Sequence, residues 1–184
     1  MPELVALLPI AAFIALAAGL VVVFRGTGRI VARTRELDHF KTAVQDLAAR
    51  VDASLGGAAR QIDAVRRRTL GPETIGDTIV AATDAVERYA DEARSLHGPV
   101  AARRIREDLV AELERAERAL GMVEHGATIM AAARRGSREL EAQTSIKRGY
   151  LNLLHAREAI ARHALEAQDI EADDGPQRAG RRIA

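Results

Sequence analysis

The sequence predicts an all-α protein, with one N-terminal transmembrane helix followed by an antiparallel bundle of about four long amphipathic helices. Residues 4–24 carry no ionisable side chain, and later apolar residues recur at the three- and four-residue spacing of one helix face. No segment shows the period of two that is typical of a strand. The pattern divides the chain into an anchor (1–24), a basic juxtamembrane segment (25–35), a helical bundle or coiled-coil domain (36–170) and a disordered tail (171–184).

The run from Leu4 to Phe24 is long enough to cross a bilayer. Its 21 residues extend about 31 Å as a helix, which matches the hydrocarbon thickness of a membrane. A cleaved secretory signal begins with basic residues, has a shorter apolar core and ends in small residues. Here the only charged residue before the run is Glu3, and the run ends in "VVVF". We therefore expect the segment to be retained as an anchor.

Four arginines follow the apolar run without an acidic residue among them, namely Arg25, Arg29, Arg33 and Arg35. Cytoplasmic flanks of membrane spans are enriched in Lys and Arg, and neither residue precedes this run. The bias predicts a single-pass protein of the inner (plasma) membrane, with its N-terminus outside and its bundle in the cytoplasm. The same arginines suit contact with anionic lipid headgroups.

A helical pattern resumes at Ile30, after Gly26 and Gly28, which we interpret as a juxtamembrane swivel. The pattern predicts an amphipathic helix of nearly forty residues. It should end at "TLGPE", where Gly71 closes the helix and Pro72 suits the first turn of the next one. Beyond Ile30, the apolar stripe comprises Leu37, Phe40, Val44, Leu47, Val51, Leu55, Ala58, Ile62 and Val65.

Two further helices are predicted, one from Glu73 to about His97 and one from about Val100 to Arg134. The segment "HGP" separates them, because Gly98 suits the residue after a helix end and a helix cannot continue through the proline that follows. Each helix has one apolar stripe. The stripes comprise Ile75, Ile79, Ala82, Val86, Tyr89, Ala93 and Leu96 in the first, and Ala102, Ile105, Leu109, Leu113, Ala116, Leu120, Val123, Ala127 and Met130 in the second.

A fourth helix is predicted from near Ser137, its N-cap, to about Ile170. Leu151 and Leu154 broaden its apolar face, as expected of a helix that also meets a partner. Short connections between the helices favour an up-down-up-down bundle. The pattern leaves open whether this bundle closes within one chain or in a homo-oligomer. The core stripe of the fourth helix comprises Ile146, Tyr150, Leu153, Ile160 and Leu165.

The composition argues against several classes of function. Without Cys the chain has no disulfide, thiolate nucleophile or thiolate metal ligand. Residues 36–169 carry 20 Lys and Arg against 22 Asp and Glu, so the bundle has no general attraction for nucleic acid. In "REDLVAELERAERAL", acids and arginines alternate at helical spacing, which is typical of a solvated face. No serine has a nucleophile-elbow neighbourhood. We therefore expect no enzyme and no cofactor.

One spacing resembles that of di-metal bundle proteins, namely Glu36-Leu37-Asp38-His39. Such a site needs two Glu-x-x-His motifs, and only this one is present. His155 and His163 lie eight positions apart, and we interpret both as solvated residues. The sequence therefore predicts no metal site, and a bundle metal protein or enzyme remains an alternative.

Antiparallel helices bring two arginine clusters together. The first and third turns would both lie at the membrane-distal end of the bundle. Cations at helix C-termini are stabilised by about 0.3–1 kcal/mol each, which explains part of the clustering. Guanidinium groups also bind carboxylates and phosphates, so the second interpretation is a docking site for an acidic protein partner. The six residues are Arg66, Arg67, Arg68, Arg134, Arg135 and Arg138.

The segment "AVERYADEAR" (Ala85–Arg94) follows apolar residues at Ile75, Ile79 and Val80. Together with the N-terminal span and the exposed bundle, it resembles the LemA family of bacterial membrane proteins, although the chain has no counterpart of that family's usual tryptophan. The resemblance implies a membrane-tethered helical module without catalytic residues. We expect a module that binds or scaffolds protein partners at the membrane surface. An alternative is a signalling element that relays helix movement from the span.

Overall fold

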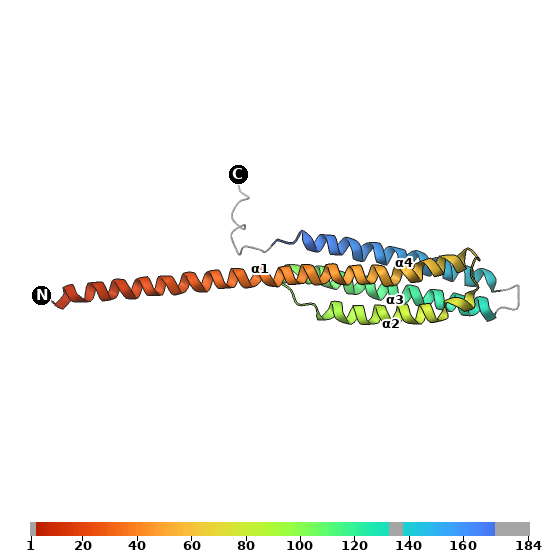
Figure 1. Ribbon diagram of the computed structural model, residues 1–184, viewed down its shortest axis with the longest axis horizontal. Helices are drawn as coiled ribbons and strands as arrows, with labels where there is room; N and C mark the ends of the chain where they lie inside the picture. The colour runs from red at the N-terminus through yellow and green to blue at the C-terminus, as the bar shows by residue number, and fades with distance from the viewer. Residues whose placement is uncertain (1–2, 133–137, 172–184) are drawn as a thin grey trace, which may run out of the picture.

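The computed structural model is all-helical in the part of the chain that it describes, residues 3–132 and 138–171, with side chains described from residue 33 onward. It confirms the predicted bundle of four helices (Figure 1). The predicted tail, apart from Glu171, lies outside the described residues. The elements are α1 (Glu3–Arg66), η1 (Pro72–Ile75), α2 (Gly76–Ser95), η2 (Val100–Ala102), α3 (Arg103–Ala132) and α4 (Glu139–Gln168), where η denotes a 3₁₀ turn.

Within the residues whose side chains the structure describes, no helix is long and apolar enough to cross a membrane. The predicted anchor at residues 1–24 lies outside the residues whose side chains are described. The transmembrane interpretation therefore stays a prediction.

Helix α1 is longer than the sequence pattern predicts. Its 64 residues extend about 96 Å, and only its C-terminal half packs within the bundle (Figure 1). The helix continues through Gly26 and Gly28, where we expected a swivel. Glycine lowers helix stability by about 1 kcal/mol relative to alanine. Unlike proline it keeps its backbone donor, so the hydrogen-bond ladder does not have to end there.

The four helices close one core within a single chain. Helix α1 packs against α2 and α4, and α3 packs against the same two helices, so the bundle is an up-down-up-down ring. The predicted stripe of α1 is buried from Leu37, which is 4% exposed, to Val65, which is 2% exposed. The largest fully buried side chains are those of Phe40, Leu47, Leu55, Ile62, Ile75, Ile79, Leu109, Leu113, Leu120, Ile146, Leu153 and Ile160.

Gly98 does not cap α2 as we expected. Helix α2 ends at Ser95, and Leu96 is its C-cap residue. A Cβ atom added at Gly98 would lie 2.8 Å from Cδ2 of Phe40, closer than real Cβ contacts come. The glycine therefore lets the α2–α3 connection approach α1 closely at the end of the bundle where α1 enters (Figure 1).

The predicted stripe of α4 is wrong at its C-terminal end. Leu165 is 69% exposed, whereas His163 is only 9% exposed and Ala164 and Ala167 are buried. Because alanine side chains are small, this part of α4 packs close to the neighbouring helices. The ring of His163 then lies at the edge of the core. The N-terminal boundary also differs, because α4 begins at Glu139 and the predicted N-cap Ser137 lies outside the described residues.

Helices α3 and α4 are in backbone contact at two glycines. A Cβ atom at Gly149 of α4 would lie 2.6 Å from the Ala119 carbonyl oxygen, and one at Gly126 of α3 would lie 2.8 Å from the Ala142 carbonyl oxygen. A carbonyl oxygen moves only with its helix. Any side chain at these positions would therefore push α3 and α4 apart.

Replacing these glycines should have the opposite effect to replacing a glycine with free space around it. We expect Gly149→Ala to lower the free energy of unfolding by about 1–3 kcal/mol through overpacking. Gly121→Ala, also within a helix but with no heavy atom within 4 Å of the added Cβ, should raise it by about 0.5–1 kcal/mol. Denaturant titration followed by circular dichroism measures both. Equal stabilisation by the two substitutions would contradict the close α3–α4 contact.

Candidate docking site at the distal tip

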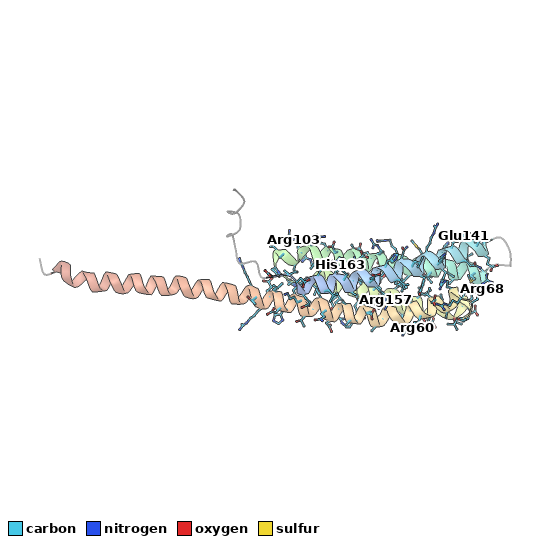
Figure 2. All side chains as sticks on the ribbon, turned by 90° about the horizontal axis from the view of Figure 1, so that it is seen from above. Arg60, Arg68, Arg103, Glu141, Arg157 and His163 are labelled. Atoms are coloured by element: carbon cyan, nitrogen blue, oxygen red, sulfur yellow. The ribbon has the colours of Figure 1, made fainter. Side chains whose placement is uncertain are left out.

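The distal tip is the end of the bundle farthest from the N-terminus of α1. It is formed by the turn after α1, the C-terminal end of α3 and the N-terminal end of α4 (Figure 1). Figure 2 places Arg68 and Glu141 at this end, and Arg103 and His163 toward the other end. Four of the six predicted docking residues are described here, whereas two lie outside the described residues. The four are Arg66, Arg67, Arg68 and Arg138, and the two are Arg134 and Arg135.

Helix α1 ends in a Schellman motif at Arg68, and not at Gly71 as predicted. The Thr69 amide donates to the Ala64 carbonyl at 2.8 Å, and the Arg68 amide donates to the Val65 carbonyl at 2.9 Å. Arg68 has a φ of 63°, a left-handed conformation in which a Cβ atom has a steric cost and glycine has none. An arginine therefore occupies the one position of the motif that most favours glycine.

Three of the tip arginines are paired with acidic residues close in sequence. The Nη2 of Arg66 and the Nε of Arg67 lie 2.6 and 2.7 Å from the two carboxylate oxygens of Asp63. The Nε of Arg138 lies 3.1 Å from Oε2 of Glu141. The hydrogen bond from Arg66 lowers the pKa of Asp63, and the hydrogen bond from Arg138 lowers the pKa of Glu141. Both carboxylates are therefore charged at neutral pH and cancel part of the arginine charge.

Arg68 reaches from the end of α1 to the start of α4. Its Nη2 donates a hydrogen bond of 2.7 Å to Oε1 of Glu139, and Nε2 of Gln143 donates one of 2.9 Å to the same oxygen. The side chains of Arg68 and Glu139 are 69% and 48% exposed. An ion pair this exposed contributes about 0–1 kcal/mol, so it can be exchanged for another partner at little cost.

A cavity of about 200 Å³ lies between the ends of α1, α3 and α4. Its wall has three cationic side chains, three apolar ones, one amide and no acidic residue. The guanidinium of Arg66 is also held over the ring of Tyr150, 5.3 Å from its centroid, in a cation–π contact. The lining residues are Val65, Arg66, Arg68, Met130, Gln143, Ile146 and Lys147.

Sequence reasoning missed Gln143 and Lys147. Their spacing of four residues places them on one face of α4, and their position near its start places that face at the tip. Both residues could therefore have been predicted at the tip from the expected position of α4. The cavity itself was not predictable, because its apolar wall combines Val65, Met130 and Ile146 from three different helices.

The predicted role of the four juxtamembrane arginines in membrane orientation stays a prediction. Arg33 and Arg35 are exposed on α1, whereas Arg25 and Arg29 lie outside the residues whose side chains are described. Among the described residues, no group of three or more His, Asp or Glu side chains could hold a metal ion.

The two histidines of α4 differ. His155 is exposed, as predicted. His163 is not solvated as we expected, because its ring is buried and its Nδ1 lies 3.0 Å from Oε2 of Glu166. The hydrogen bond with His163 lowers the pKa of Glu166. This pair belongs to the opposite end of the bundle from the tip (Figure 2).

No family model, curated protein or solved structure matches this chain. The resemblance to the LemA family therefore stays a prediction from the residues alone.

Proposed function

We propose that this protein is a membrane-tethered helical module that binds or scaffolds protein partners through its distal tip. One observation carries the proposal. A single helix, α1, bears the apolar run near one end and leads to the arginine-rich tip at its other end. Between Leu37, the first buried residue among those of α1 with described side chains, and Arg66, the last residue of α1, the helix extends about 44 Å. An anchored chain would therefore present the tip well away from the membrane surface.

The mechanism of this proposal is confinement. Residues 4–24 anchor the chain, and Arg25, Arg29, Arg33 and Arg35 hold the bundle on the cytoplasmic side. The anchor limits the bundle to a thin layer next to the membrane, which raises its effective concentration toward other membrane-bound proteins. The guanidinium groups of the tip suit a partner with acidic residues on its surface.

The orientation can be tested with a reporter fused after Ala184. A reporter that is active only in the cytoplasm should be active in this fusion, because the Lys and Arg bias favours a cytoplasmic bundle. Protease added outside sealed cells should leave the bundle intact. Cleavage from outside would reverse the proposed orientation, and a mature N-terminus beyond Phe24 would show that the apolar run is a processed signal.

The docking role can be tested by crosslinking in membranes followed by mass spectrometry. A variant with four tip substitutions should lose at least nine-tenths of the partner recovered with the wild-type chain, because the acidic partner loses its charged contacts. A control variant that removes the same charge from exposed positions elsewhere should retain recovery. The tip variant is Arg66→Gln, Arg67→Gln, Arg68→Gln and Arg138→Gln, and the control is Arg60→Gln, Arg88→Gln, Arg115→Gln and Arg118→Gln.

Undiminished recovery of the same partners by the folded tip variant would contradict the docking role. Helicity measured by circular dichroism shows whether each variant is folded. Equal loss in both variants would show that recovery depends on overall charge and not on the tip.

A second candidate function is a signalling element that relays helix movement from the span. The continuity of α1 through Gly26 and Gly28 favours it, because an unbroken helix transmits rotation better than a flexible joint. Insertion of Gly-Pro-Gly after Gly28 should break the helix and separate the two functions. If the protein is a tether, the variant with the insertion should recover the same partners in the crosslinking experiment. If it is a relay, changes in the span should no longer affect the bundle in this variant.

A further inference from the structure

We propose that the cavity at the distal tip binds a single acidic side chain of a partner protein, and that Glu139 occupies its donors when no partner is bound. The proposal rests on the proposed docking function and refines it. It assigns the contact to one cavity, and it predicts an internal competitor.

The hydrogen bonds of Glu139 show which chemistry the donors accept. Two lining residues, Arg68 and Gln143, direct N–H groups at one carboxylate oxygen, at 2.7 and 2.9 Å. One donor is charged and the other is neutral, a combination that suits an oxygen of a carboxylate. Glu139 itself is not part of the cavity wall. The donors at the cavity are therefore satisfied by an acid from outside it.

The charge of the wall is not balanced by this one acid. Arg66, Arg68 and Lys147 contribute three positive charges to the wall. Arg66 shares Asp63 with Arg67, and Lys147 forms no ion pair with any acidic residue in the described part of the chain. An incoming carboxylate would therefore gain the ammonium group of Lys147, which neither Glu139 nor Asp63 pairs.

The size and the apolar part of the cavity limit the ligand. About 200 Å³ is less than the roughly 300–1,000 Å³ of a typical small-molecule pocket, and it suits one side chain. Val65, Met130 and Ile146 offer contacts for the methylene groups of a Glu or Asp side chain. The occupant that fits is an acidic residue carried by a protein segment.

The backbone at Arg68 provides an independent argument. Its φ of 63° would be relaxed by glycine, so the arginine side chain is present at a cost to the fold. Residues held in such conformations are found preferentially at binding sites. The guanidinium of Arg68 is the group that this position supplies.

The test uses the full-length chain in nanodiscs of zwitterionic lipid and a fluorescent hexaglutamate peptide as the probe. Fluorescence anisotropy gives the dissociation constant. We expect Arg68→Gly to weaken binding at least tenfold while raising the thermal midpoint of unfolding, because glycine suits the left-handed conformation. Loss of binding in a more stable variant cannot be attributed to unfolding.

Two further variants complete the test. Glu139→Gln should tighten binding at least threefold, because it removes the internal competitor. Arg88→Gln, which removes one positive charge from an exposed position of α2 outside the cavity wall, should change the affinity less than twofold.

Equal weakening by Arg88→Gln and Arg68→Gly would overturn the cavity assignment, and so would unchanged or weaker binding by Glu139→Gln. Absence of hexaglutamate binding by the wild-type chain would also overturn it. None of these results decides the docking function, which is tested by the recovery of partners in the crosslinking experiment. If the four-arginine variant loses its partners while Arg68→Gly keeps them, the tip docks a partner but the cavity does not hold it.

Discussion

Burial of the apolar stripe on α1 holds the four-helix bundle together. The stripe runs from Leu37 to Val65, and every predicted member between them is at most 4% exposed. Helices α2 and α4 pack on its two sides, and α3 closes the ring. The length of the stripe therefore sets the length of the bundle. Because Val65 immediately precedes Arg66, the hydrophobic register of α1 also places the positive charge at the tip.

The stripes of α1, α2 and α3 could be predicted because burial follows the spacing of side chains along a helix. Features that depend on an opposing helix could not. From helix propensity alone, Gly149 should only weaken α4. Its role depends on α3, because a Cβ atom added at Gly149 would lie 2.6 Å from the Ala119 carbonyl oxygen. Helix propensity favours Gly71 as the cap of α1, whereas the left-handed residue is Arg68. Leu165 is exposed because the alanines around it, and not the leucine, face the core.

Part of the site was also predictable. The antiparallel order of the helices brings the arginine clusters to one end, but the prediction counted cations without their acidic neighbours. Asp63 lies three and four residues before Arg66 and Arg67, a spacing at which ion pairs form on a helix. The helix dipole explains those two arginines but not Arg138, which is the N-cap residue of α4, where a positive charge is unfavourable. The tip therefore has more positive charge than helix capping requires.

In the proposed function, α1 holds the tip away from an anchoring membrane. Energy transfer to acceptor lipids measures this separation, because the chain has no Cys and a single fluorophore can be attached at either end of the bundle. Val100→Cys labels the end where α1 enters and Leu70→Cys labels the tip, both at exposed positions. Their neighbours on α1, Phe40 and Ala64, are about 36 Å apart along the helix. We expect this arrangement to give strong transfer from residue 100 and weak transfer from residue 70. Equal transfer from both positions, or stronger transfer from residue 70, would contradict it.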